Sequence, residues 1–124
     1  MTAKRSPATT RSRVPDRGDL LWLEFPEHAA RGTAGHEQRG RRPALVLSPK
    51  AYNGRAGLAI VCPVTSQVKG YPFEVPLPKG LPIEGTVLSD QVRTIDWRAR
   101  KARHVCAVPV GVIDAVRQRL ATLI

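Results

Sequence analysis

The strongest chemical signal in this sequence lies in the stretch EQRGRRPALVLSP, from Glu37 to Pro49. At its centre stands the pair Arg42-Pro43. Proline fixes its own φ and biases the preceding residue toward extended geometry, so Arg42 should leave the polar segment in a defined direction. A guanidinium held at the first residue of a buried strand is suited to binding an anionic substrate. The alternative interpretation is that Arg42 is one more solvated cation in a basic protein.

Metal-free cleavage of RNA is one reaction that such an arginine could support, because the 2′-hydroxyl is a built-in nucleophile. The protein must then supply a base, stabilise charge on the phosphoryl oxygens and protonate the leaving oxygen. A preorganised donor contributes roughly 3 to 4 kcal/mol to the second task. Arginine cannot be the base, because it is not deprotonated in proteins. Glu37, with His36 beside it, is the nearest candidate base, and burial would have to raise its pKa. Exposed loop polarity is the alternative for both residues.

Hydroxyl groups follow a second apolar run, LAIVCPV, which ends just before Thr65 and Ser66. These hydroxyls could donate hydrogen bonds to a phosphate, although a hydroxyl that caps the end of a strand is the common alternative. The remaining histidines outside the arginine-rich stretch, His28 and His104, are interpreted as surface or structural residues.

Several other chemistries have no support in the sequence. It contains no GxxxxGK[ST], GxGxxG, HExxH or GxSxG motif. Its ten carboxylates are spread along the chain, whereas a two-metal nuclease clusters several at one site. Two cysteines without CxxC spacing and three scattered histidines make no zinc pattern. We therefore expect neither a metal nor another cofactor.

Length and charge indicate a single basic domain with an anionic partner. The chain has 124 residues, and 20 Lys and Arg against 10 Asp and Glu give a net charge of +10. This balance favours nucleic acid or an acidic protein as the partner. A membrane is not expected, since no apolar run approaches the roughly 20 residues that span a bilayer. The N-terminus lacks the apolar region of a secretory signal, which predicts a cytoplasmic protein. Cys62 and Cys106 are expected to be small buried hydrophobic residues rather than a disulfide.

The elements that must position these groups are short strands. Residues 1–14 are predicted to be a disordered basic tail and 15–124 a single domain. Apolar or alternating runs predict a mainly β, mostly antiparallel domain of five to seven strands with a C-terminal helix. The predicted strands are 19–25, 43–47, 58–65, 73–75, 104–108 and either two strands or one bent strand within 85–97. Pro63 indicates that pairing lapses near the end of the third, leaving Thr65 at an edge or mouth.

Turns, one long loop and a helix complete the prediction. Asn53-Gly54 is a strong turn signal. The seventeen residues 26–42 lack periodicity, and loops of this length tend to be functional. Pro109 suits the first position of a helix. The helix should bury one apolar stripe, formed by Ile113, Val116, Leu120 and Leu123.

Taken together and in order, several segments resemble the MazF/PemK family of toxin endoribonucleases. The segments are GDLLWLEF, EQRGRRPALVLSP, YN, CPVTSQVKGYPFEV, GTVLSDQVR and IDWRARKA. The resemblance implies an SH3-like small antiparallel β-barrel of the MazF, Kid and CcdB kind, usually a homodimer. It also implies sequence-specific, metal-independent cleavage of single-stranded RNA that leaves a 2′,3′-cyclic phosphate and a 5′-hydroxyl. The implied inhibitor is an acidic, MazE-like antitoxin whose extended tail lies in the RNA groove.

The resemblance also implies roles for single residues. Arg42 and Thr65 match the family's catalytic pair, to which the reasoning above adds Glu37 as a candidate base. The residues expected to bind RNA are Arg39, Arg41, Ser66, Gln67, Lys69, Gln91, Arg93 and Arg98. The segment 26–36 is longer than the usual short loop, and Arg41 replaces a histidine found in some relatives, so sequence preference is not carried over.

Two other functions use the same barrel. The first is a gyrase-poisoning toxin that binds protein and cuts nothing, but related barrels of that kind lack the combination of Arg42 and Thr65. The second is a noncatalytic RNA-binding barrel. The sequence holds only six aromatic residues, which leaves few platforms for stacking bases.

Overall fold

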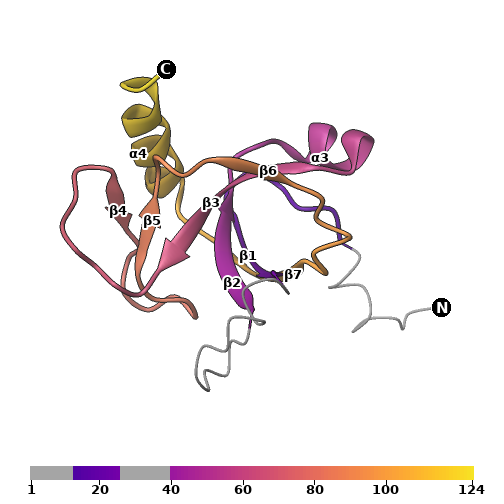
Figure 1. The fold of residues 1–124 in the computed structure, drawn as a ribbon, viewed down its shortest axis with the longest axis horizontal. Helices are drawn as coiled ribbons and strands as arrows, with labels where there is room; N and C mark the ends of the chain where they lie inside the picture. The colour runs from indigo at the N-terminus through magenta and orange to yellow at the C-terminus, as the bar shows by residue number, and fades with distance from the viewer. Residues whose placement is uncertain (1–12, 26–39) are drawn as a thin grey trace.

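The computed structural model describes residues 13–25 and 40–124. Over these residues the chain forms seven strands and two helices (Figure 1). In chain order they are β1 (Asp19–Glu24), β2 (Arg41–Val46), α3 (Lys50–Ala56), β3 (Ala59–Thr65), β4 (Glu74–Pro76), β5 (Thr86–Leu88), β6 (Arg93–Ile95), β7 (Arg103–Ala107) and α4 (Val110–Ala121). The predicted mainly β fold with a C-terminal helix is confirmed.

The strands pair in the order β4-β5-β3-β2-β1-β7, and β6 pairs with β3 beside this path. Every pairing is antiparallel. The segment 85–97 therefore contains two strands rather than one bent strand. β6 pairs with the start of β3 and β5 pairs with its end. β3 is thus the strand that joins the two parts of the sheet.

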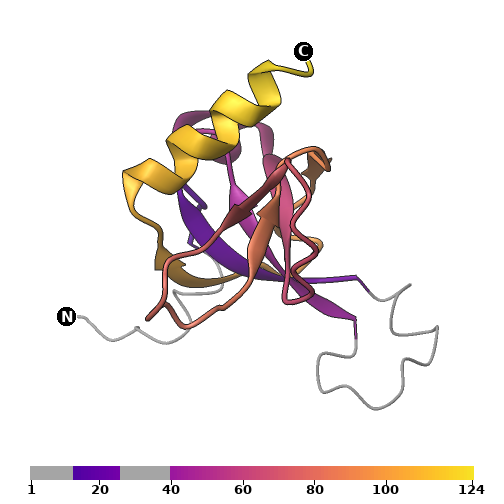
Figure 2. The same cartoon turned by 90° about the vertical axis from the view of Figure 1, so that its left-hand side faces the viewer.

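The central strands are buried on both faces, which explains why their sequences are apolar runs rather than strict alternations. One face packs under α4, β4 and β5, and we call this cluster the helix-side core: Leu20, Leu45, Cys62, Val64, Val75, Leu77, Ile83, Val87, Val112, Ile113 and Val116. Figure 2 shows α4 lying across this side of the strands. The other face forms the loop-side core: Leu21, Leu23, Phe25, Ala44, Val46, Ala59, Val61, Ile95, Trp97 and Ala102.

The turn predicted at Asn53-Gly54 is wrong, because both residues lie inside α3. The Asn53 side chain is fully buried and donates hydrogen bonds of 2.8 Å to the Pro15 carbonyl and 2.9 Å to the Ser48 carbonyl. These tertiary partners outweigh the local preference of Asn-Gly for a turn. α3 ends at Ala56. Gly57 follows as the C-cap, in the left-handed conformation with a φ of 73°.

The C-terminal helix ends before the last residue of the predicted apolar stripe, Leu123. α4 ends at Ala121, so Leu123 lies beyond it and is half exposed. Ile113 and Val116 are buried as predicted. Pro109 occupies the capping position before the helix rather than its first turn.

The N-terminal part of the described chain is anchored rather than free. Val14 packs on the loop-side core and Pro15 is fully buried. The predicted boundary at residue 14 therefore falls within an ordered stretch, while the predicted tail up to residue 12 lies outside the described residues. Cys62 and Cys106 are both free thiols, the first buried and the second partly buried.

Candidate active site

Arg42 is the second residue of β2, which begins two residues before the predicted strand. It pairs with Leu23 of β1 and is exposed. Side chains alternate along a strand, so Arg42 lies on the same face as Ala44, the loop-side face. Arg41 lies on the opposite face, with its guanidinium carbon 5.3 Å from the centre of the Trp22 ring. The side chains of Arg41 and Arg42 therefore lie on opposite faces of the sheet.

Thr65 is the last residue of β3 and lies near the same end of the sheet as Arg42. The β2–β3 ladder pairs Ala44 with Pro63 and Leu45 with Cys62. Continuing that register by two residues would set Arg42 opposite Thr65, and alternation puts both on the loop-side face. The ladder stops at Pro63, as the sequence predicted. The other edge of β3 is paired at this point, because β5 lies on the side of β3 away from β2 and Thr86 pairs with Thr65.

A tight turn orients the Thr65 hydroxyl. The backbone N–H of Gln67 donates a hydrogen bond of 3.1 Å to Thr65 Oγ1. The same segment is held further along by Glu74, a buried carboxylate that accepts hydrogen bonds from the backbone N–H groups of Lys69 and Gly70, the latter at 3.0 Å. Because Thr65 Oγ1 accepts from the backbone, its own proton remains available to donate to a ligand.

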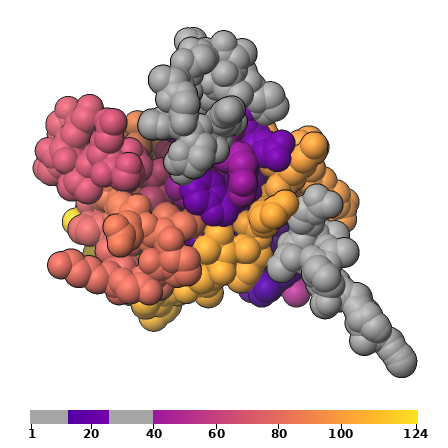
Figure 3. Space-filling view, turned by 90° about the horizontal axis from the view of Figure 1, so that it is seen from below, coloured from indigo at the N-terminus to yellow at the C-terminus, as the bar shows by residue number. Residues whose placement is uncertain are grey.

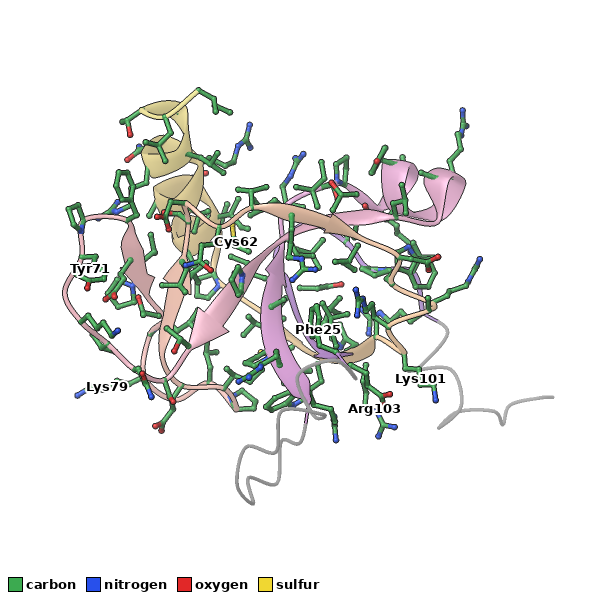
Figure 4. The ribbon with its side chains drawn as sticks, in the orientation of Figure 1. Phe25, Cys62, Tyr71, Lys79, Lys101 and Arg103 are labelled. Atoms are coloured by element: carbon green, nitrogen blue, oxygen red, sulfur yellow. The ribbon has the colours of Figure 1, made fainter. Side chains whose placement is uncertain are left out.

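A pocket of about 430 Å³ opens beside Thr65. Its walls combine a hydroxyl, an amide, carboxylates and aromatic rings. The lining residues are Thr65, Gln67, Lys69, Tyr71, Pro72, Phe73, Glu74, Leu88, Asp90 and Gln91. Figure 4 shows Tyr71 on the connection between β3 and β4, at the outer edge of the molecule, where its side chain is 60% exposed. Polar groups beside exposed ring surface are suited to a planar ligand that offers donors and acceptors at its edge.

Two further cations lie over the ring of Phe25, which closes the end of β1 (Figure 4). The guanidinium carbons of Arg93 and Arg100 are 4.9 and 4.6 Å from the ring centre. Arg93 pairs with Val61 of β3, which places it on the loop-side face together with Arg42. Seen from below, the ends of β1 and β2 lie between segments from the middle and from the last quarter of the chain (Figure 3). The loop-side face therefore carries the cations Arg42, Arg93 and Arg100.

Comparison with known proteins matches this chain to one family over nearly its whole length. The family described as "PemK-like, MazF-like toxin of type II toxin-antitoxin system" matches residues 16–124. The chain belongs to this family. It is 44% identical over 111 residues to the endoribonuclease toxin MazF of Escherichia coli K12, covering 90% of this chain and 95% of that protein. It is 32% identical over 115 residues to the endoribonuclease toxin ChpB of the same strain, covering 88% and 93%.

Solved structures of MazF proteins share the fold. MazF of Deinococcus radiodurans superposes with a TM-score of 0.76 at 55% identity, covering 89% of this chain and 96% of that chain. A MazE-MazF structure from the same organism gives 0.76 at 50% identity, covering 89% and 94%. The antiparallel sheet and its C-terminal helix are therefore the MazF fold.

In this MazF-like chain, four of the predicted residues line one pocket: Thr65, Gln67, Lys69 and Gln91. Arg42 and Arg93 lie on the adjacent loop-side face. Ser66 is exposed next to Thr65. Two predicted RNA contacts lie elsewhere: Arg41 stacks on Trp22 on the opposite face, and Arg98 lies 4.6 Å from the centre of the buried Trp97 ring. Glu37 and Arg39, with His28 and His36, fall outside the described residues.

Several residues of the site were not predicted from the sequence. Phe25 and Arg100 form the stack described above, and Tyr71, Glu74 and Asp90 line the pocket. The only local signal was the aromatic residue at the end of a predicted strand. Arg100 lies in the segment RARKAR, which has four cations in six residues, and nothing in the sequence indicates that this side chain would reach back to Phe25.

Cys62, a buried thiol of the helix-side core, has a shifted pKa. Burial raises the pKa of Cys62 from 9.0 to about 12, and the nearby Asp90 carboxylate adds to this shift. His104 is held between Arg13, which lies 3.4 Å from its Nδ1, and Asp19, whose Oδ1 lies 3.4 Å from its Nε2. These contacts agree with a structural role for His104.

The described part of the chain has neither a cluster of metal-binding side chains nor a membrane-spanning helix. Residues 13–25 and 40–124 contain no group of three or more His, Cys, Asp or Glu side chains that could hold a metal ion. The same residues include no helix long and apolar enough to cross a membrane.

Proposed function

We propose that this chain is a metal-independent, sequence-specific endoribonuclease toxin that cleaves single-stranded RNA through the 2′-hydroxyl. The observation that supports the proposal is the β2–β3 register, which pairs Ala44 with Pro63 and, if extended by two residues, would set Arg42 opposite Thr65 on one face. Membership of the MazF-like toxin family and the relatives named as endoribonucleases support it.

In the proposed reaction the 2′-oxygen attacks the adjacent phosphorus and the bond to the 5′-oxygen breaks. The products are a 2′,3′-cyclic phosphate and a 5′-hydroxyl. One proton leaves the 2′-oxygen and one joins the departing oxygen, so the reaction is balanced without a co-reactant. Glu37 is the proposed acceptor of the first proton.

Arg42 and Thr65 would act on the phosphoryl oxygens. A guanidinium offers a fork of N–H donors that matches two phosphate oxygens. The Thr65 hydroxyl, fixed by the Gln67 N–H, would donate its free proton to an oxygen of the same phosphate. Both residues lie in strands, and the Thr65 hydroxyl is already oriented before substrate binds, which reduces the reorganisation needed as charge develops.

The pocket would bind a base of the RNA, and the cations would bind its phosphates. The pocket beside Thr65 would take one base, with Asp90 and Gln91 reading its edge and Tyr71 offering a stacking surface. Arg93 would bind a neighbouring phosphate from its position on Phe25. The net charge of +10 would draw the RNA backbone to this face.

An acidic, MazE-like antitoxin and a second copy of the chain are the proposed protein partners. MazE-MazF structures are among the solved relatives. A peptide rich in carboxylates would compete with RNA for the same cations, which accounts for inhibition by occupation of the groove. We further propose that the protein acts in the cytoplasm, where its RNA substrate is available.

Cleavage of a long single-stranded RNA in EDTA tests the proposal. The purified protein should cut at a short recurring sequence, and the new 5′ ends should accept phosphate from a polynucleotide kinase without prior phosphatase treatment. Arg42→Ala and Thr65→Ala should each lower the cleavage rate by about 10²- to 10³-fold. Arg55→Ala, which removes an exposed cation from α3, is the matched control and should cut at the normal rate.

Two results would contradict the proposal. Undiminished cutting by a folded Arg42→Ala variant would remove that residue from the mechanism. If the protein does not cut RNA but traps gyrase on supercoiled DNA, the gyrase-poisoning function is correct instead.

A further inference from the structure

Gly85, the residue before β5, lies against the backbone of Thr65. Its φ is +136°, and a Cβ built on it would lie 2.2 Å from the Thr65 carbonyl oxygen and 2.9 Å from the carbonyl carbon. The same Cβ would lie 3.3 Å from the Cα of Ser66. All three atoms belong to the main chain, so no side-chain rotation can relieve the contact.

Other glycines with positive φ lack this contact. Gly57, Gly70 and Gly80 have φ values of 73°, 80° and 95°, and a Cβ on any of them would meet no atom within 4 Å. These glycines meet a conformational requirement only. Gly85 meets that requirement and also allows the start of β5 to approach β3 at the residue proposed to contact the scissile phosphate.

Hydrogen bonds hold Gly85 in this position. The backbone N–H of Leu77 donates a hydrogen bond of 2.9 Å to the Gly85 carbonyl, and the Leu77 side chain is buried in the helix-side core. On the next residue, Thr86 pairs with Thr65 in the β3–β5 ladder. Gly85 is therefore fixed between the end of β4 and Thr65. A side chain at this position would have to push Thr65 and Ser66 outward.

We propose that Gly85 is a positioning residue for Thr65, which sets how far the Thr65-Gln67 turn projects toward the substrate. The inference rests on the proposed role of Thr65 in catalysis. Gly85 touches neither RNA nor reacting atoms. It acts through the Thr65 carbonyl, which lies one residue before the Ser66 Cα and two before the Gln67 N–H that fixes the Thr65 hydroxyl.

The test compares Gly85→Ala with Gly80→Ala. Both substitutions place alanine at a positive φ in the connection that leads from β4 into β5, but only the first introduces a collision with Thr65. Gly85→Ala should lower kcat by about 100-fold, since a displacement near 1 Å is enough for such a loss. KM should change by less than about threefold, because the cations that bind the RNA backbone are untouched. Gly80→Ala should retain the kcat of the parent protein.

A second readout does not depend on activity. The amide signal of Gln67 should shift in Gly85→Ala and its hydrogen exchange should accelerate, while both stay unchanged in Gly80→Ala. A folded Gly85→Ala protein with normal kcat and an unmoved Gln67 amide would overturn the inference. If Gly85→Ala does not fold, amide hydrogen exchange of Gln67 in the parent protein is the deciding measurement. A protected Gln67 amide supports a Thr65-Gln67 turn fixed by its contact with Gly85, and an unprotected amide refutes it.

The Thr65→Ala variant separates this inference from the proposed function. If Thr65→Ala cuts RNA normally, the catalytic role of Thr65 is wrong, whatever Gly85 does. If Thr65→Ala is inactive while Gly85→Ala is folded and fully active, the catalytic role stands and the positioning role of Gly85 fails.

Discussion

The indole N–H of Trp97 donates a hydrogen bond of 3.0 Å to the backbone carbonyl of Asn53, 44 residues earlier in the chain. Both residues are fully buried. The Asn53 amide in turn donates to Pro15 and Ser48. One buried asparagine therefore joins the N-terminal stretch, the start of α3 and the turn after β6.

Replacing Asn53 should destabilise the protein without changing its chemistry. Asn53→Ala leaves two buried carbonyls and the Ser48 hydroxyl without their partner, which should lower the free energy of unfolding by about 3 kcal/mol. Urea denaturation measures this loss. Tyr52→Ala, at the exposed preceding residue, should cost less than Asn53→Ala. A loss below about 1 kcal/mol for Asn53→Ala would contradict the role of this residue as a link.

Gly54 and Gly57 should respond to alanine in opposite directions. Gly54 lies inside α3, and a Cβ there would make an ordinary 3.5 Å contact with Val14. Gly54→Ala should therefore stabilise the protein by up to about 1 kcal/mol through helix propensity. Gly57 has a φ of 73°, so Gly57→Ala should destabilise it by about 1 kcal/mol. Thermal unfolding of the two variants decides between helix and turn at Gly54, because a left-handed turn would give a loss at both positions.

Arg93 should contribute both charge and stacking to RNA binding. Arg93→Gln should weaken binding of a fully 2′-O-methylated RNA, which cannot be cut, and should reduce the slope of log K against log salt by about 0.7. Arg93→Lys should keep the slope, because the charge remains, yet bind less tightly, because a lysine ammonium does not stack on Phe25 as a guanidinium does. Fluorescence anisotropy over a salt series measures both effects. An unchanged slope in Arg93→Gln would show that Arg93 contacts no phosphate.

Replacing Thr86 by valine should make the protein more stable. The Thr86 side chain is fully buried, and its hydroxyl has no hydrogen-bond partner among residues 13–25 and 40–124. Thr86→Val removes this polar group while keeping the shape, so the free energy of unfolding should rise by about 1 kcal/mol. Guanidinium denaturation measures the change. A clear loss of stability would reveal a partner for the hydroxyl, such as a buried water.

The two cysteines should differ in reactivity. Burial, and then the Asp90 carboxylate, raises the pKa of Cys62 to about 12, so only roughly 10⁻⁴ of it is thiolate at pH 8. Burial and Asp19 also raise the pKa of Cys106, which is partly exposed. Because both shifts are upward, labelling should speed up as the pH rises toward 9. Iodoacetamide followed by mass spectrometry should modify Cys106 in the folded protein and Cys62 only in urea. Equal labelling of both in the folded state would contradict this.

The sequence predicts strands well here because the core strands are short apolar runs bounded by Gly, Pro and charge. It also predicts the lapse in pairing at Pro63, since proline has no N–H to donate. It fails at Asn53, where two buried partners from distant segments, Pro15 and Trp97, together with the nearby Ser48, outweigh a strong local preference. It fails likewise at Leu123, because an apolar stripe does not show where a helix stops.

The candidate site is only partly visible in the sequence. Arg42 and Thr65 are predicted from their neighbours, because each lies in a strand that contains a proline, Pro43 in β2 and Pro63 in β3. That Arg41 and Arg42 serve opposite faces follows from strand alternation, once β2 is known to begin at Arg41 rather than Pro43. The stack of Arg93 and Arg100 on Phe25 joins three separate segments, so no local pattern could have revealed it.

β3 pairs with β6 up to Val61 and with β2 up to Pro63, and of the described strands only β5 pairs with its last two residues, Val64 and Thr65. Within this described sheet, the last two residues of β3 are therefore tied by β5 alone. Heating should loosen the Thr65 segment before the shared core gives way, so RNA cleavage should be lost several degrees below the melting temperature of the protein.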